Sequence, residues 1–139
     1  MATKKILLID DEAALTRIMR LNLEQTGRFE VREENRGSNA VAAAREFQPD
    51  LIFLDVMMPD MDGDEIAEQL DGDPELRYIK YVFLTAIVTK SETGDGAAEI
   101  SGKTFLAKPV KRDELLAVVD ELIGDGAPSS TMDRTPRTG

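Results

Sequence analysis

The segment LIFLDVMMPDMDG, residues 51–63, decides the fold and also raises the question of function. Leu51 to Leu54 is an apolar run without polar alternation, which is typical of a strand buried on both faces of a parallel sheet. The run ends on a carboxylate, Asp55, and a loop rich in Asp follows. Ligands of open parallel sheets bind at the carboxyl ends of the strands, so the segment predicts that Asp55 belongs to a site.

Four further apolar runs alternate with helical patterns along the chain. An alternation of strands and helices predicts an α/β fold, with a parallel sheet between two layers of helices. The expected strands are residues 4–9, 29–33, 51–54, 81–84 and 104–107. The expected helices are residues 13–25, about 38–48, 64–70 and 113–123.

Local signals set the expected ends and faces of these helices. The first helix has Leu15, Ile18 and Leu21 on its apolar face, and Gly27 ends it. Ser38 or Asn39 is the expected N-cap of the second helix.

Two segments fit this regular pattern poorly. Residues 89–100 contain two glycines, each of which costs about 1 kcal/mol inside a helix, so we expect a short or irregular fourth helix there. Residues 124–139 are rich in Gly, Pro, Ser and Thr and are expected to form a disordered tail. Residues 1–123 would then form a single domain.

The composition excludes several classes of function. The chain of 139 residues has no cysteine and no histidine, which excludes disulfides, thiol catalysis and an imidazole base. Its net charge of −10 argues against general binding to nucleic acids or anionic membranes. No apolar run approaches the roughly 18 residues of a membrane span. The first residues lead directly into a strand, so we expect no signal peptide and a cytoplasmic protein.

Polar residues follow four of the five expected strands. Asp10 and Asp11 come after the first strand, Asp55 after the third, Thr85 after the fourth and Lys108 after the fifth. Each of them has an ordinary structural explanation, such as a helix cap or a solvated strand end. Parallel strands deliver their carboxyl ends to one edge of the sheet, however, so the joint pattern predicts one shared site.

The residue types in this site fit together chemically. Three carboxylates repel one another by roughly 4 kcal/mol per pair at about 4 Å and an effective dielectric of 20, and Lys108 alone cannot offset three charges. A divalent cation with oxygen ligands, Mg²⁺ or Mn²⁺, can do so. Asp55 can then act as a nucleophile toward phosphorus and form an aspartyl phosphate. The metal and Lys108 would neutralise the phosphoryl oxygens, and the Thr85 hydroxyl would donate a hydrogen bond to one of them.

These motifs together resemble the receiver domain of response regulators in two-component signalling. They are IDDE at residues 9–12, FLDVMMPDMDG at 53–63, LTA at 84–86 and FLAKP at 105–109. The resemblance extends from residue 4 to about residue 123. It implies the flavodoxin-like fold of the family, a doubly wound five-stranded parallel sheet in the order 2-1-3-4-5.

The resemblance also implies a role for each site residue. Asp55 would be the phosphoacceptor. Asp10 and Asp11 would surround the metal, with Asp11 as the more direct ligand, and Asp55 and the backbone carbonyl of Met57 would complete the protein ligands.

The remaining implied roles concern the conformational switch that follows phosphorylation in this family. Thr85 and Lys108 would contact the phosphoryl group, and Phe105 would follow Thr85 inward on phosphorylation. The Lys108–Pro109 peptide bond would be cis, which only a following proline makes common.

The family implies a signalling phosphoacceptor that promotes its own phosphorylation and dephosphorylation, not an enzyme in the usual sense. The expected donor is a histidine kinase or a histidine phosphotransfer protein, and the expected output is contact with a protein partner. The acidic stretch at residues 111–121 lacks the basic pattern of receivers that dimerise to bind DNA, so we expect a monomer or weak dimer. Apolar side chains at Met57 and Ile87, which flank the attacking water in the family, predict slow autodephosphorylation.

Other interpretations of these residues compete with this one. A dehalogenase-type phosphatase needs a second Asp where Met57 stands. A flavin-binding flavodoxin needs a phosphate loop where IDDE stands. A calcium loop built from residues 60–64 lacks its glycine, because that position is Glu65. A degenerate receiver that binds partners without phosphorylation, and a receiver cut from a longer regulator, stay open.

Overall fold

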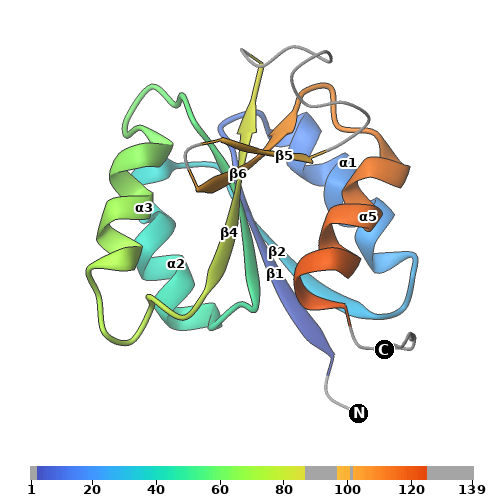
Figure 1. The fold of residues 1–139 in the computed structure, drawn as a ribbon, viewed down its shortest axis with the longest axis horizontal. Helices are drawn as coiled ribbons and strands as arrows, with labels where there is room; N and C mark the ends of the chain where they lie inside the picture. Colours follow the sequence, from blue (N-terminus) through green and yellow to red (C-terminus); the bar gives the residue numbers. More distant parts are fainter. Residues whose placement is uncertain (1–2, 87–96, 101, 125–139) are drawn as a thin grey trace.

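The computed structural model describes residues 3–86, 97–100 and 102–124 (Figure 1). Strands and helices alternate along most of the chain. In order they are β1 (Lys4–Ile9), α1 (Ala13–Glu24), β2 (Phe29–Glu34), the 3₁₀ turn η1 (Gly37–Asn39), α2 (Ala40–Phe47), β3 (Leu51–Asp55), α3 (Gly63–Asp71), β4 (Lys80–Thr85), β5 (Ala97–Ile100), β6 (Lys103–Ala107) and α5 (Arg112–Ile123).

The strands form one sheet in the order β2-β1-β3-β4-β6-β5. The strands from β2 to β6 in this order are all parallel, and β6 is the fifth parallel strand along the chain. The predicted five-stranded parallel sheet in the order 2-1-3-4-5 is therefore confirmed. Helices α1 and α5 cover one face of the sheet, and α2 and α3 cover the other (Figure 1).

The edge strand β5 corrects the prediction for residues 89–100. Residues 97–100 were expected to be helical, but they pair antiparallel with β6, with Ala97 opposite Leu106 and Ile100 opposite Lys103. Gly102, at φ +78°, makes the tight return between the two strands, a conformation that glycine adopts at little cost. A local hairpin gives these residues backbone partners that a glycine-interrupted helix would provide poorly. Residues 89–96 lie outside the described part of the chain, as do residues 125–139 of the expected tail.

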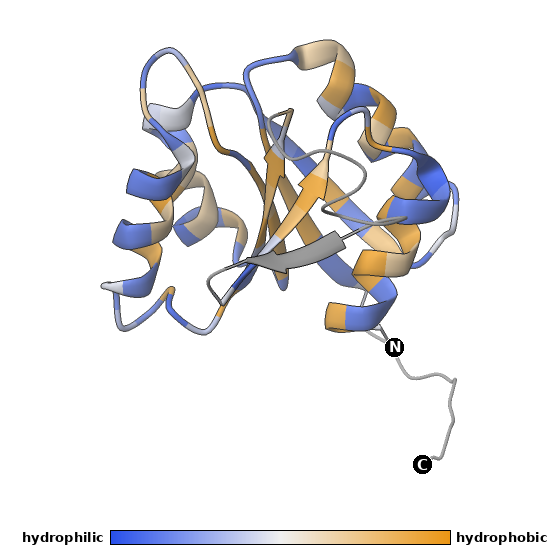
Figure 2. Cartoon of the chain, turned by 45° about the horizontal axis from the view of Figure 1, so that its top comes forward, coloured by the Kyte–Doolittle hydropathy of each residue, from blue (hydrophilic) through white to orange (hydrophobic). Residues whose placement is uncertain are grey.

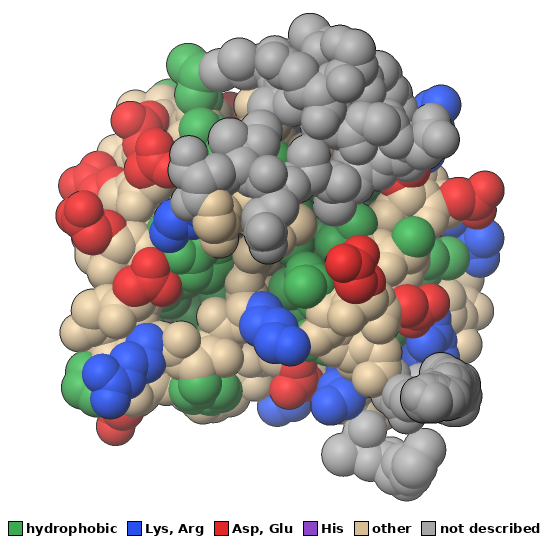
Figure 3. Space-filling model, viewed as in Figure 1, with side chains coloured by type: hydrophobic (Ala, Val, Ile, Leu, Met, Phe, Trp, Pro, Cys, Tyr) green, Lys and Arg blue, Asp and Glu red, His purple; other side chains and the backbone are tan. Residues whose placement is uncertain are grey.

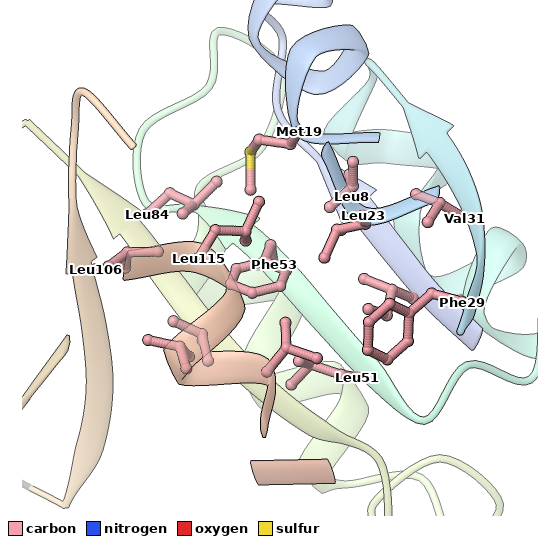
Figure 4. Close-up of a cluster of buried hydrophobic side chains, with 14 residues drawn as sticks. Leu8, Met19, Leu23, Phe29, Val31, Leu51, Phe53, Leu84, Leu106 and Leu115 are labelled. Atoms are coloured by element: carbon pink, nitrogen blue, oxygen red, sulfur yellow. The ribbon is translucent and has the colours of Figure 1, made fainter. Parts of the chain in front are cut away.

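The core lies in two layers, one on each face of the sheet. Every residue of β3 is buried, and alternate side chains point to opposite faces. Leu51 and Phe53 join the cluster beneath α1 and α5, whose packing is shown in Figure 4. Ile52 and Leu54 join the cluster beneath α2 and α3. Figure 2 shows the same pattern as apolar strands between helices with polar outer sides. The prediction that residues 51–54 form a strand buried on both faces is therefore confirmed.

The buried face of α1 differs from the predicted one. Met19, Leu23 and the polar Thr16 are buried, whereas Ile18 is 56% exposed and Leu21 is 48% exposed. Of the three residues expected on this face, only Leu15 packs against the core cluster. The difference arises because a polar residue occupies a buried position of the helix, and its hydroxyl is bonded to Glu33 of β2 at 2.7 Å.

The 3₁₀ turn η1, which leads into α2, is capped from a distant part of the chain. Neither Ser38 nor Asn39 makes the expected side-chain cap. Instead, the carboxylate of Asp60 accepts the N–H groups of Gly37 at 3.2 Å and Ser38 at 2.9 Å. These bonds lower the pKa of Asp60 and tie the loop after β3 to the turn after β2.

Two leucines of α1 give a matched test of this helix orientation. We predict that Leu23→Ala lowers the free energy of unfolding by about 2–5 kcal/mol, because it leaves a cavity in the core. Leu21→Ala should change it by less than about 1 kcal/mol, because half of the side chain is already in water. Urea unfolding of both variants measures the difference. Equal losses would mean that the helix is rotated from its position in the structure.

Candidate functional site

The carboxyl ends of β1, β3, β4 and β6 meet around one pocket of about 280 Å³. The structure thus brings together the residues that the sequence placed at the strand ends. The lining residues are Asp11, Glu12, Asp55, Val56, Met57, Thr85, Ala86 and Lys108. Asp10 lies beside the pocket, fully buried.

The ammonium group of Lys108 is at the centre of this arrangement. Its Nζ lies 2.8 Å from Asp10 Oδ2, 3.3 Å from Asp55 Oδ1 and 3.2 Å from Glu12 Oε1. Sequence reasoning assigned no role to Glu12, although it is the third consecutive acid of the IDDE motif. Its side chain is 62% exposed, so it meets the lysine from the solvent side of the site.

Local backbone geometry holds the two buried acids in place. The N–H of Glu12 donates to Asp10 Oδ1 at 2.9 Å, and the N–H of Met57 donates to Asp55 Oδ1 at 3.3 Å. Gly63 lets the loop after β3 close tightly, because a Cβ there would lie 2.3 Å from the backbone oxygen of Asp55. Any larger residue at this position would displace the end of β3.

The environment of the pocket raises the pKa of Asp55 to about 6. Burial of the carboxyl group is the main cause, and the neighbouring charge of Asp10 adds to it. Lys108 and the N–H of Met57 act in the opposite direction but do not cancel these effects. For Lys108 itself, burial opposes the charged form, but the hydrogen bond to Asp10 and the two aspartate charges outweigh burial and raise its pKa.

The acidic residues have the chemistry of a metal site. Asp10, Asp11 and Asp55 each offer one carboxylate oxygen, and these oxygens lie within 4.8 Å of one another. An all-oxygen donor set of this kind suits a hard divalent cation such as Mg²⁺, because one lysine cannot compensate the charges of three carboxylates. The residues present therefore fit the metal that the sequence predicted. The remaining expected ligand is the backbone of Met57, which lines the same pocket.

The predicted switch residues lie on neighbouring strands. Thr85 ends β4 in the pocket wall and is 4% exposed. Phe105 of β6 is half-buried and stacks on Phe83 of β4 with ring centroids 5.1 Å apart. The Lys108–Pro109 peptide bond is cis. Ile87 lies outside the described residues.

A second pocket of about 300 Å³ lies at the opposite end of β4, between α3, the β5–β6 turn and the end of α5. Figure 3 views this face, where basic side chains flank a hollow between α3 and α5. Both lysines of this pocket already have partners: Lys103 Nζ lies 2.8 Å from the hydroxyl of Tyr81, and Lys80 donates to the carbonyl of Leu122 at 2.7 Å. Within the described residues, the acidic cluster belongs to the first pocket alone.

Comparisons with known proteins agree with this geometry. The family model for the response regulator receiver domain matches residues 6–120. The phosphate regulon transcriptional regulatory protein PhoB of Rhizobium meliloti is 36% identical over 89% of this chain and 54% of its own length. The polar-differentiation response regulator DivK of Brucella ovis is 27% identical over 88% of this chain and 98% of its own length. The structure of the chemotaxis response regulator CheY4 of Vibrio cholerae has a TM-score of 0.73 and 25% identity, covering 88% of this chain and all of that one.

The chain therefore belongs to the response regulator receiver domain family. It spans about half the length of PhoB and nearly all of DivK. None of the helices in the described residues is long and apolar enough to cross a membrane.

The raised pKa of Asp55 predicts a pH-dependent stability in metal-free protein. The folded state keeps the Asp55 proton up to about pH 6, whereas the unfolded chain loses it near 3.8, so folding stability falls as the pH rises between these values. Asp55→Asn removes the buried charge. It should raise the free energy of unfolding at pH 7 by on the order of 1 kcal/mol, allowing for screening by water in the open pocket.

This stabilisation should disappear when the pH falls below 3.8, where wild-type Asp55 is protonated as well. Urea unfolding of both proteins with a chelator present, at neutral and acidic pH, measures the effect. A variant that is less stable than wild type at pH 7 would show that the Asp55 charge is favourable in the fold, contrary to this electrostatic account.

Proposed function

We propose that this receiver accepts a phosphoryl group on Asp55 in a Mg²⁺-dependent reaction and passes the signal to a protein partner. The observation that carries the proposal is the buried Asp55 carboxylate between an acidic pair and Lys108, open to a pocket large enough for a phosphoryl group. Asp60, Asp62 and Asp64 follow closely in the sequence but are not part of this cluster.

The reaction would transfer phosphorus from the donor to one oxygen of Asp55. The new P–O bond forms as the bond from phosphorus to the donor nitrogen breaks, and that nitrogen takes up a proton as it leaves. Asp55 must be ionised to attack, and its pKa of about 6 in the metal-free protein already leaves it mostly ionised at neutral pH.

Three groups would stabilise the transferred phosphoryl group. Lys108, now 3.3 Å from Asp55 Oδ1, is close enough to shift its ammonium to a phosphoryl oxygen. The Thr85 hydroxyl, at the end of the adjacent strand, would donate to a second oxygen. A metal held by Asp10, Asp11, Asp55 and the Met57 carbonyl would supply further positive charge.

The conformational change that follows phosphorylation would pass from Thr85 to Phe105. Movement of Thr85 toward the phosphoryl group vacates space at the end of β4, and Phe105 lies one strand away, paired with Phe83 in the register of the sheet. The half-buried ring can then turn inward. The surface around β6 and α5 would change and present a different face to a protein partner.

The donor would be a histidine kinase or a histidine phosphotransfer protein, which receivers of this family use, and the reaction would take place in the cytoplasm. The match extends over nearly all of DivK, which supports a receiver that works without an attached output domain. Coverage of only half of PhoB supports the alternative, a receiver within a longer regulator. In either arrangement the chain itself would be the phosphoacceptor module, and its net charge of −10 makes direct DNA binding by this part unfavourable.

Intact-mass spectrometry after incubation with a small-molecule phosphoryl donor tests the proposal. We predict one added phosphoryl group in wild-type protein with Mg²⁺, and none with a chelator or in Asp55→Asn. Asp62→Asn is the matched control, because it changes a nearby acid outside the cluster and should still be phosphorylated.

Each other result has a definite meaning. An adduct that persists in Asp55→Asn would show that Asp55 is not the acceptor. No adduct from either a small-molecule donor or a phosphorylated histidine phosphotransfer domain would identify a degenerate receiver that works without phosphorylation.

The side chain at Met57 predicts the lifetime of the phosphoryl group. Met57 is 65% exposed and lines the pocket, and its thioether cannot orient a water molecule for attack on phosphorus. We predict that Met57→Asn shortens the lifetime by about tenfold, the effect of one hydrogen bond of ~1.4 kcal/mol in the transition state. Loss of radiolabelled phosphate after donor removal measures it, with Ile18→Asn as an exposed control on α1. An unchanged lifetime in Met57→Asn would refute this role.

A further inference from the structure

A chain of polar contacts runs from the backbone of Asp10 to the exposed side of α1. Asn35 Nδ2 lies 2.7 Å from the carbonyl oxygen of Asp10 and 3.0 Å from Thr16 Oγ1. Thr16 Oγ1 in turn lies 2.7 Å from Glu33 Oε1, and Glu33 Oε2 lies 3.0 Å from Arg20 Nε. Four separate segments, the end of β1, α1, β2 and the loop after β2, meet in this chain.

The direction of each hydrogen bond follows from the donors available. The amide of Asn35 has two N–H groups, one for the Asp10 carbonyl and one for Thr16. The Thr16 hydroxyl has one hydrogen, and the carboxylate of Glu33 is a closer and stronger acceptor than the carbonyl of Ala13 at 3.1 Å. Every member therefore has a defined partner, which makes the network stiff.

Three of the four polar atoms of Asp10 have hydrogen bonds, and the fourth, the buried Oδ2, has only the ion-pair contact with Lys108. Its N–H donates to the carbonyl of Glu34 at 3.2 Å, and its carbonyl accepts from Asn35. Its Oδ1 accepts from the N–H of Glu12, and its Oδ2 contacts Lys108. A network that served only to pack α1 on β2 would not need to end on this residue.

The bond to the Asp10 carbonyl also affects Asp11. The carbonyl group of Asp10 and the N–H of Asp11 belong to one planar peptide unit. The hydrogen bond from Asn35 therefore fixes the orientation of the peptide plane that precedes the Asp11 Cα. Asp11 is exposed, and no hydrogen bond or ion pair of its carboxylate is found in the described residues. The backbone that Asn35 holds therefore sets the point from which the Asp11 side chain starts, and only rotation about the side-chain bonds remains to place its carboxylate.

We propose that Asn35 and Thr16 are positioning residues that set the Asp10 and Asp11 carboxylates at the separation a divalent cation requires. This inference rests on the proposed function, since it concerns the same acidic site. Neither residue reaches the pocket itself, so both act through the main chain of Asp10. Outer contacts of this kind change metal affinity by about 10–100-fold in other metal sites.

Isothermal titration with Mg²⁺ on the full chain tests the proposal. We expect Asn35→Ala to weaken Mg²⁺ binding by about tenfold or more. Thr16→Val, which keeps the shape but loses the hydroxyl, should also weaken binding. Thr16→Ser, which restores the hydroxyl, should return the affinity to that of wild type.

Two control variants separate positioning from general stability. Asn39→Ala removes an exposed amide from the same segment, one that contacts Glu34 and not Asp10. Val119→Ala destabilises the core beneath α5 without touching the network. Both should bind Mg²⁺ as wild type does, at a temperature where circular dichroism shows every variant to be folded.

Wild-type affinity in both Asn35→Ala and Thr16→Val would overturn the inference. An equal loss of affinity in Val119→Ala would also overturn it, because the effect would then follow stability alone. If Asn35→Ala does not fold, the comparison of Thr16→Val with Thr16→Ser decides the question. A wild-type protein that binds no Mg²⁺ would instead refute the metal in the proposed function, and this inference with it.

Discussion

The buried carboxylates of Asp10 and Asp55 share one ammonium group, and the rest of the site depends on this imbalance of charge. Lys108 lies 2.8 Å from one and 3.3 Å from the other, and Asp11 adds a third acid within reach. Burial of the Asp55 carboxyl group raises its pKa, and the neighbouring charge of Asp10 adds to the effect. A divalent cation would offset the same imbalance, and the proposed phosphorylation depends on that cation, because the acids alone would repel a phosphoryl group.

The fold keeps these charges together at some cost to its own stability. Strand β3, in which every residue is buried, anchors Asp55 in the core of the molecule. The loop after β3 is held by Gly63, which packs against the backbone of Asp55, and by Asp60, which caps the turn before α2. The network through Asn35 and Thr16 holds the end of β1 from the other side. Local strain and repulsion at a site are tolerated when the surrounding structure determines it this fully.

The sequence predicted the parallel sheet and the convergence of the polar residues, because buried strands and strand-end acids are local signals. The strand order came from the resemblance to the receiver family and not from these signals. It did not predict the buried face of α1, because Thr16 is polar and its burial depends on Glu33 and Asn35, which are distant in the sequence. The sequence did not predict the cap of the turn before α2 for the same reason, since Asp60 comes from another loop.

Strand β5 and the contact between Glu12 and Lys108 also needed tertiary information. Residues 97–100 have no strong strand pattern of their own, and their pairing exists because β6 offers a free edge. Glu12 reaches Lys108 only when the first and last parallel strands of the sequence end at the same rim, a separation of 96 residues along the chain. Periodicity and motif spacing carry no signal for either contact.

Borohydride reduction of the phosphorylated protein, followed by peptide sequencing by mass spectrometry, tests the central claim most directly. The reagent converts an aspartyl phosphate to homoserine and leaves free carboxylates unchanged, so it marks the acceptor itself. The account predicts homoserine at position 55 and nowhere else, and only when Mg²⁺ was present during phosphorylation. Homoserine at Asp60, Asp62 or Asp64, or at Asp55 irrespective of metal, would contradict it.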